Sequence, residues 1–227
     1  LSLGKSLLKL NLLHTQSWKE IVEHTQQQIK QTPPGIWVEG RGWHQEKWTE
    51  SPGLTVDGYP FHEALSAISP ENPVMLIHAS GHALIANAKA MELAKISPET
   101  ISPKGGRIVK DPSGRLTGVF EENAMSLIKN AFEAYEKSLS EEEQRDRLRR
   151  YAMKASEACL HYGICSFQDC GSSLVELHAL KTLADSGLLY PRLWVMLYST
   201  PDSLKTEALQ LPVGPNDKMN FYSNAIK

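Results

Sequence analysis

The second half of the chain alternates predicted strands and helices at a nearly constant spacing. Predicted strands start at Ile164, Arg192 and Phe221, which are 28 and 29 residues apart. Strand–helix units of this length imply parallel strands joined by right-handed crossovers, and a (β/α)8 barrel has a repeat of about 30 residues. Residues 140–227 are therefore predicted to form successive β/α units of a barrel. Three strands cannot close a barrel, so a sheet edge is expected to stay exposed, which makes a homo-oligomer possible.

Helix-capping motifs support this alternation. Ser140 and Glu143 form a capping box that begins a helix over residues 140–162, and a second capping box begins at Ser173 and starts a helix over residues 173–186. A glycine follows each helix, as is common at helix ends. The two helices are thus predicted to flank the strand that starts at Ile164.

Residues 35–139 lack this spacing and are predicted to form a mixed α+β insertion. Strands over residues 107–110 and 116–120 are joined by Asp111-Pro-Ser-Gly114, a turn with proline at its second position and glycine at its fourth. Residues 1–34 are predicted to supply a barrel helix that follows a first strand not contained in the chain. The predicted fold class is α/β, an incomplete TIM (β/α)8 barrel with a mixed α+β insertion.

Charge and composition exclude several classes of partner. The formal net charge of −2 gives no support for nucleic acid or an anionic membrane as a partner. Apolar runs are far shorter than the roughly 20 residues of a membrane span. The three cysteines form no Cys-x-x-Cys motif and are odd in number, so a disulfide framework is not expected. A reducing, cytoplasmic location is expected instead.

The stretch from Asn72 to Met91 has the layout of a site carried by a loop. A strand over Val74–Ile77 precedes the polar segment His78–His82, and a helix is predicted over Leu84–Leu93. Two histidines four residues apart on one continuous helix could bind zinc, but the glycine between them argues against such a helix. His82 could instead donate a hydrogen bond to a substrate carbonyl or carboxylate, or be satisfied by the neighbouring helix end.

Three tryptophans fall within twelve positions, Trp37, Trp43 and Trp48. Trp43 lies in the segment Gly40–His44, which is predicted to be a loop because its two glycines permit unusual backbone angles. A substrate-lining role for Trp43 and simple packing of the local core are both open.

Several segments resemble the YtcJ-like branch of the amidohydrolase superfamily, also called amidohydrolase family 3, in the same order along the chain. The segments are HASGHALIANAKAMELA (residues 78–94), GIWVEGRGWHQEKW (35–48), GGRIVKDPSGRLTGVFEENA (105–124), GICSFQDCG (163–171) and NAIK (224–227). Each is short, but together they extend over nearly the whole chain. The resemblance implies a metal-dependent hydrolase barrel that cleaves a carbon–nitrogen bond of an amide, formamide or cyclic amide. It also implies a divalent metal, with zinc expected, and a small-molecule substrate.

The resemblance further implies that the chain is a central portion of such an enzyme. The family has a His-x-His pair near its start and further metal-ligand histidines and a catalytic aspartate later, and no His-x-His occurs here. A fragment without activity, or a module that binds a small molecule without chemistry, therefore stays open. Stoichiometric metal would count against the module.

Five further residues are candidates for the site. Lys227 matches the family's carboxylated lysine, which bridges two metal ions, and it ends a predicted barrel strand, where catalytic groups of this fold collect. Gln168 and Asp169 close another such strand; both are expected near the pocket, although Asp169 could instead cap the next helix. Glu121-Glu122 follows the hairpin. One of the two could face the pocket, although a solvated pair at a helix start is expected.

Overall fold

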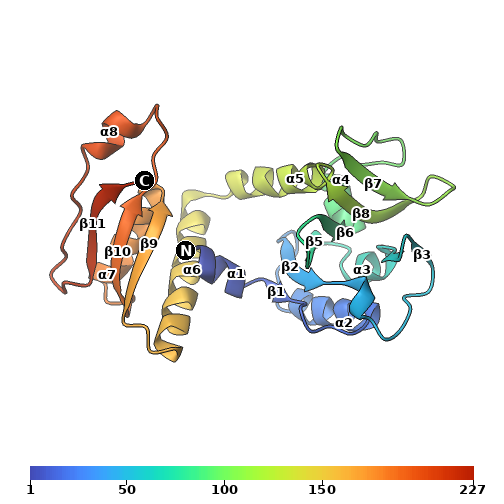
Figure 1. Cartoon of the computed structure of the whole chain (residues 1–227), viewed down its shortest axis with the longest axis horizontal. Coiled ribbons are helices and arrows are strands. Elements are labelled where there is room, and N and C mark those ends of the chain that lie inside the picture. The colour runs from blue at the N-terminus through green and yellow to red at the C-terminus, as the bar shows by residue number, and fades with distance from the viewer. The chain divides into compact units, whose positions relative to one another are not determined.

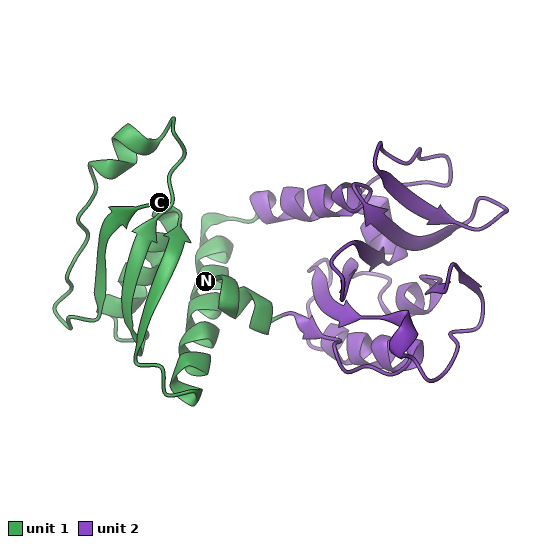
Figure 2. Cartoon of the chain, in the orientation of Figure 1, with its two compact units in different colours: residues 1–8, 139–227 green, residues 9–138 purple.

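The computed structural model describes residues 1–227, and these divide into two compact units (Figures 1 and 2). Unit 1 comprises Leu1–Leu8 and Leu139–Lys227, and unit 2 comprises Lys9–Ser138. Each unit has its own sheet and its own buried apolar side chains. No helix has the combined length and apolar character needed to cross a membrane.

Unit 1 is built on a three-stranded parallel sheet in the order β11-β10-β9. Neighbouring strands in this sheet are consecutive in the chain, and a helix lies between each pair in sequence, as the predicted β/α units require. The elements of unit 1 are α1 (Ser2–Leu7), α6 (Glu141–His161), β9 (Ser166–Ser172), α7 (Leu174–Asp185), β10 (Arg192–Leu197), α8 (Leu204–Ala208) and β11 (Phe221–Ile226). The helices and strands predicted over residues 140–227 are therefore confirmed, with bounds that differ by a few residues.

Both predicted capping boxes in unit 1 are formed. Ser140 accepts a hydrogen bond from the backbone nitrogen of Glu143 while the Glu143 carboxylate accepts one from the backbone of Ser140, and Ser173 and Glu176 do the same at α7. The two helices thus begin where the sequence predicts. The apolar side of the sheet, with Val195 fully buried in β10, packs against α6 and α7.

Unit 2 contains a six-stranded mixed sheet in the order β1-β2-β5-β6-β8-β7. The strands β1, β2 and β5 are parallel, whereas β5, β6, β8 and β7 pair antiparallel. A small hairpin, β3 with β4, stands apart from this sheet. The elements are β1 (Leu10–Asn11), α2 (Trp18–Ile29), β2 (Val38–Trp43), the 3-10 helix η1 (Gln45–Lys47), β3 (Thr55–Val56), β4 (Tyr59–Pro60), α3 (Glu63–Ile68), β5 (Val74–His78), β6 (Ala83–Ala86), α4 (Ala88–Leu93), β7 (Gly106–Lys110), β8 (Leu116–Glu122) and α5 (Met125–Ser138).

Helices cover both faces of this sheet. Successive side chains of a strand point to opposite faces, and in β5 the fully buried Leu76 belongs to one apolar cluster while its neighbour Met75 belongs to the other. The first cluster includes side chains of α2 and α3, and the second includes side chains of α4 and α5. The predicted hairpin is confirmed as β7 and β8.

The segment predicted as one helix over Leu84–Leu93 is a strand followed by a short helix. Asn87 separates them, because its side chain accepts a hydrogen bond from Ala90 and caps α4. The apolar run before it extends the sheet as β6 and pairs with both β5 and β8. A short apolar run fits a buried strand or a helix equally well, and the prediction was wrong for its first half.

The segment Gly40–His44, predicted to be a loop, is largely strand. A β-carbon on Gly40 would lie 2.7 Å from Leu76 Cδ2, and one on Gly42 would lie 2.7 Å from the backbone nitrogen of Leu13. Glycine here permits close approach of neighbouring strands rather than a break in the strand.

The boundary between the compact units lies between Leu8 and Lys9, whereas the sequence placed a boundary after residue 34. Residues 9–34 group with unit 2 because β1 pairs with β2 and α2 packs against the sheet. The division into barrel and insertion stays a prediction.

Candidate functional site

Lys227 lies directly after β11, at the carboxyl end of the parallel sheet of unit 1. Its backbone nitrogen donates to Leu197 O at 2.8 Å, and its Nζ lies 3.2 Å from Cys170 O. The side chain is exposed and thus reaches over the carboxyl ends of β9 and β10. This is the edge at which parallel α/β sheets carry their sites.

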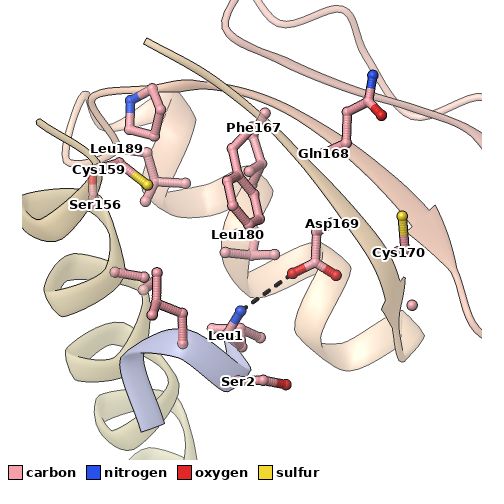
Figure 3. A pocket seen from close by; sticks show the side chains of 16 residues that line it. Leu1, Ser2, Ser156, Cys159, Phe167, Gln168, Asp169, Cys170, Leu180 and Leu189 are labelled. Carbon is pink, nitrogen blue, oxygen red and sulfur yellow. Dashed lines mark hydrogen bonds and ion pairs between the residues drawn. The ribbon is translucent and has the colours of Figure 1, made fainter. Parts of the chain in front are cut away.

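Gln168 and Asp169 lie on opposite faces of β9, because adjacent residues of a strand alternate. In the register of the sheet, Gln168 pairs with Trp194 and Asp169 pairs with Val195, whose side chain belongs to the core against the helices. Figure 3 shows the two side chains pointing apart. Asp169 accepts a hydrogen bond from Ser172 Oγ at 3.1 Å and does not cap α7, since Ser173 does.

A cavity of about 260 Å³ lies beside β9 in unit 1 (Figure 3). Apolar side chains make up much of its wall, together with Cys159 and Ser156 from α6. Asp169 faces it, and its carboxylate forms an ion pair with the amino group of Leu1 at 3.2 Å. Both oxygens of this carboxylate are therefore engaged, which holds the side chain in one orientation.

The described residues do not assemble a complete metal centre. No group of three or more His, Cys, Asp or Glu side chains is placed so that it could hold an ion. Lys227 contacts a backbone carbonyl, and no second side-chain donor is brought to its Nζ. A single lysine does not meet the ligand number that a divalent ion requires, so no reaction step can be built on a metal held by these residues alone.

Trp43 is in the core of unit 2. Its side chain is fully buried, and its indole nitrogen donates to Leu76 O at 2.9 Å. The ring packs against Trp48 and Tyr59 at centroid distances of 6.3 and 6.1 Å, and against His78 at 4.7 Å. This geometry favours the packing interpretation of Trp43, because the ring offers no surface to a ligand.

His78 and His82 point to different partners and do not form a metal pair. The His78 ring is buried; its Nδ1 lies 2.8 Å from Ser80 Oγ and its Nε2 lies 3.2 Å from Gln45 Oε1. Burial, and then the neighbouring His44, lower the pKa of His78 to about 4. His78 is therefore neutral at pH 7 and organises the loop between β5 and β6.

His82 is exposed at the end of that loop and faces the end of β8. Its Nδ1 lies 3.0 Å from the carboxylate of Glu122. The other ring nitrogen, Nε2, has no hydrogen-bond partner among the described residues 1–227. The sequence left open whether the His82 ring bonds to a substrate or to a neighbouring helix end. The structure shows no hydrogen bond from the ring to a helix end.

Three charged residues close to His82 differ from what the sequence predicted. Glu121 and Glu122 end β8 and do not stand at a helix start: Glu121 binds Arg107 Nε at 2.6 Å and Tyr59 OH at 2.9 Å, and Glu122 binds His82. Arg41 lies beside the loop, and its place between two glycines in a predicted loop was the only sequence feature that marked it.

The candidates fall into two groups. Gln168, Asp169 and Lys227 belong to unit 1, and Trp43 and His82 belong to unit 2. Within unit 1, Lys227 reaches the strand that carries the other two candidates. Within unit 2, Trp43 supports the loop that ends at His82, since Trp43 O accepts from the nitrogen of Ala79 at 2.9 Å.

Known proteins are similar to this chain in both sequence and fold. Protein LONG AFTER FAR-RED 3 of Arabidopsis thaliana is 29% identical over 168 residues, which are 74% of this chain and 26% of that protein. The putative amidohydrolase YtcJ of Bacillus subtilis (strain 168) is 33% identical over 128 residues, 56% of this chain and 23% of that protein. The N-substituted formamide deformylase of Arthrobacter pascens is 36% identical over 112 residues, 49% of this chain and 20% of that protein.

Two solved structures share the fold. An uncharacterized metal-dependent hydrolase from Pyrococcus horikoshii OT3 superposes with a TM-score of 0.62 at 21% identity, covering 98% of this chain and 39% of that chain. One from Pyrococcus furiosus gives a TM-score of 0.64 at 23% identity, covering 99% and 41%.

The chain spans about a quarter of the length of the curated relatives that it matches. The pattern that defines the amidohydrolase family matches residues 4–220, nearly the whole of this chain. The chain belongs to the amidohydrolase family.

Proposed function

We propose that this protein is a metal-dependent hydrolase that uses water to cleave a carbon–nitrogen bond of an amide, a formamide or a cyclic amide. The observation that carries the proposal is the family match over residues 4–220. The bond type is supported by the 36% identity over 112 residues to an N-substituted formamide deformylase. The substrate is accordingly a small molecule.

We also propose that the parallel sheet of unit 1 is part of an incomplete (β/α)8 barrel that carries a mixed insertion. Support comes from three parallel strands that are neighbours in chain order, and from the fold similarity to two metal-dependent hydrolases. The free edge of β9 would be a place for self-association, since β9 pairs only with β10. A cytoplasmic location stays a prediction.

Lys227 is proposed as one ligand of a divalent metal, with zinc expected, and further donors are required. When bound, such an ion lowers the pKa of its water and polarises the substrate carbonyl. To serve as a ligand, the neutral amine of Lys227 would add to carbon dioxide and release a proton, which leaves a carbamate with two oxygens. The exposed position of Lys227 beside the ends of β9 and β10 gives carbon dioxide access to it.

His82 and Gln168 are each proposed as a substrate-contacting residue within its own unit, unit 2 and unit 1 respectively, and Asp169 is proposed to hold the cavity wall of unit 1 in place. His82 is exposed with Nε2 free, and Gln168 is exposed on the sheet face away from the helices. Trp43 is proposed to act only through the loop that it supports, because its ring is fully buried.

Carbamate formation on Lys227 tests the proposed ligand directly. The protein is incubated with ¹³C-labelled bicarbonate and zinc, and carbon NMR is used to detect a carbamate. We expect a signal that is absent in Lys227→Ala and retained in Lys205→Ala, which removes an exposed lysine of α8. A carbamate signal of equal size in both variants, or none in the parent protein, would refute the role of Lys227.

A second candidate is a module that binds a small molecule without catalysing a reaction, and an inert fragment is its limiting case. The cavity of about 260 Å³ beside β9 favours binding, as does the absence of a complete donor cluster among residues 1–227. This alternative would be supported over the hydrolase if the protein bound a ligand without metal and released no amine from amides.

A further inference from the structure

Arg41 lies on β2 beside the loop His78–His82 of unit 2. The strands β2 and β5 are paired in parallel, with Arg41 opposite Ile77, so the loop that follows β5 lies at the carboxyl end of β2 (Figure 1). A methyl carbon built on Gly81 would lie 3.6 Å from Arg41 Nη2. The guanidinium group is therefore beside the tip of this loop.

The side chain of Arg41 is exposed and makes no hydrogen bond or ion pair within residues 1–227. Glu39, which lies on the same face of β2, binds Lys9 at 2.7 Å. Glu122 binds His82 at 3.0 Å. Arg41 thus keeps a positive charge that no carboxylate of the chain neutralises, since Glu39 and Glu122 are paired with other residues.

The loop itself is fixed by its own hydrogen bonds. Gly81 N donates to His78 O at 3.0 Å, His82 N donates to Ser80 Oγ at 3.1 Å, and Ser80 Oγ lies 2.8 Å from the His78 ring. Gly81 has a φ of +81°, which a residue with a β-carbon rarely adopts. The loop backbone is therefore prearranged, and it places His82 directly after Gly81, the residue that the Arg41 guanidinium approaches.

Glu122 holds the imidazole of His82. Its backbone nitrogen donates to His82 O at 2.9 Å, and its φ of +50° is uncommon for a residue other than glycine. The carboxylate of Glu122 engages Nδ1 of His82, which leaves Nε2 without a partner at the exposed end of the ring. A strained residue that fixes a histidine ring is a feature expected at a binding site.

We propose that Arg41 and His82 form a binding site for the carboxylate of a small ligand, with Glu122 as the positioning residue for His82. The planar guanidinium can bind both oxygens of a carboxylate at once. The exposed imidazole of His82, with Nε2 unpartnered, supplies a second polar contact. The ligand class that fits is an amide that carries a carboxylate. That this ligand is a substrate rests on the proposed function, whereas the binding site does not.

Calorimetric titration with N-acetylglycine, in a metal chelator so that no metal-dependent turnover occurs, tests the site. We expect N-acetylglycine to bind and the uncharged N-acetylglycinamide to bind at least about tenfold more weakly, because a charged hydrogen-bonded pair is lost. Arg41→Gln should weaken binding of the acid by about tenfold to a hundredfold. Arg192→Gln, which removes an exposed arginine of unit 1, should leave the affinity unchanged.

Glu122→Gln provides the test of positioning. It should weaken binding less than Arg41→Gln does, and it should shift the nitrogen NMR signals of His82 without shifting those of His78. Unchanged His82 signals in Glu122→Gln would refute the positioning role.

Equal affinities for the acid and the amide, or equal affinities of Arg41→Gln and Arg192→Gln, would overturn the site. Inorganic phosphate that binds as tightly as N-acetylglycine and is lost with Arg41 would overturn the carboxylate class. If the protein bound the carboxylate but had no hydrolytic activity, the binding site would be supported and the proposed function would not. Failure of the site can therefore be told apart from failure of the proposed function.

Discussion

Replacing Asn87 by alanine should strongly destabilise unit 2. The side chain is fully buried at the junction of β6 and α4. Its Oδ1 accepts from Val74 N at 2.9 Å and from Ala90 N at 3.0 Å, and its Nδ2 donates to Ser69 O at 3.0 Å and Asn72 O at 2.9 Å. One amide thus joins β5, the helix α4 and the turn before β5.

The expected cost follows from these contacts. Loss of an asparagine cap at a helix start costs about 1 kcal/mol. Leaving a buried group such as Val74 N–H without a partner adds about 1–3 kcal/mol. The free energy of unfolding should therefore fall by about 3 kcal/mol, and with an m-value of about 2 kcal/mol/M the urea midpoint should fall by about 1.5 M.

Urea unfolding followed by tryptophan fluorescence measures this change, because four of the five tryptophans lie in unit 2. Asn123→Ala is the matched control: Asn123 is exposed, and its Nδ2 makes one bond, to Lys104 O at 2.9 Å. The control should cost less than about 1 kcal/mol. Equal midpoints for the Asn87 and Asn123 variants would refute the reasoning.

Three further predictions concern unit 2. Gly118→Ala should lower the free energy of unfolding in urea by about 2–4 kcal/mol, because Gly118 has a φ of +87° and the added methyl would lie 2.6 Å from a backbone carbonyl oxygen. A loss below about 1 kcal/mol, as at an ordinary surface position, would contradict this. Burial, then Glu121, raise the pKa of Tyr59 from 10.0 to about 12, so its stabilising contribution is full below pH 10 and is lost as pH rises to about 12. An ultraviolet difference titration against Tyr59→Phe should show this ionisation near pH 12, and one near pH 10 would disprove it. The pKa of His78 is lowered from 6.5 to about 4. Its contribution to the free energy of unfolding is therefore present above pH 6.5 and declines as pH falls towards 4. If the urea midpoint of His78→Gln fell over this pH range as much as that of the parent protein, the prediction would be contradicted.

The sequence predicted elements well where local chemistry determines them. The capping box at Ser140 and the turn Asp111–Gly114 act through neighbouring residues, and both are formed as expected. The strand spacing also predicted the parallel sheet of unit 1. Parallel strands need a long crossover connection, usually a helix, and the predicted strands are far enough apart in the sequence to hold one.

The errors arose where distant residues decide the outcome. The apolar run before Asn87 became a strand because β5 and β8 offer it two partners, which no local pattern records. Gly40 and Gly42 indicated a loop, yet they serve contacts with Leu76 and with Leu13 across the sheet. The same applies to the candidate site: Arg41 was missed because the pairing of β2 with β5 brings it to the loop, and nothing in the sequence near Arg41 reveals that pairing.

The residue-level candidates were predicted with uneven success for a related reason. The spacing of the repeats placed Lys227 directly after a strand, and that position is confirmed. Gln168 was predicted to end its strand, but β9 continues to Ser172 because its pairing with β10 extends that far, so Gln168 lies within the strand. Their chemical roles stay predictions, because a role depends on partners that the spacing does not identify. Trp43 shows the contrast, since a tryptophan beside two glycines suits a pocket or a core equally well until its burial is known.

Release of amine and formate from an N-substituted formamide by the purified protein tests the central claim most directly. The account predicts equal amounts of the two products, loss of the reaction on treatment with a chelator, and recovery on addition of zinc. Release of no product by the zinc-loaded protein, or release that a chelator leaves unchanged, would contradict a metal-dependent hydrolase of carbon–nitrogen bonds.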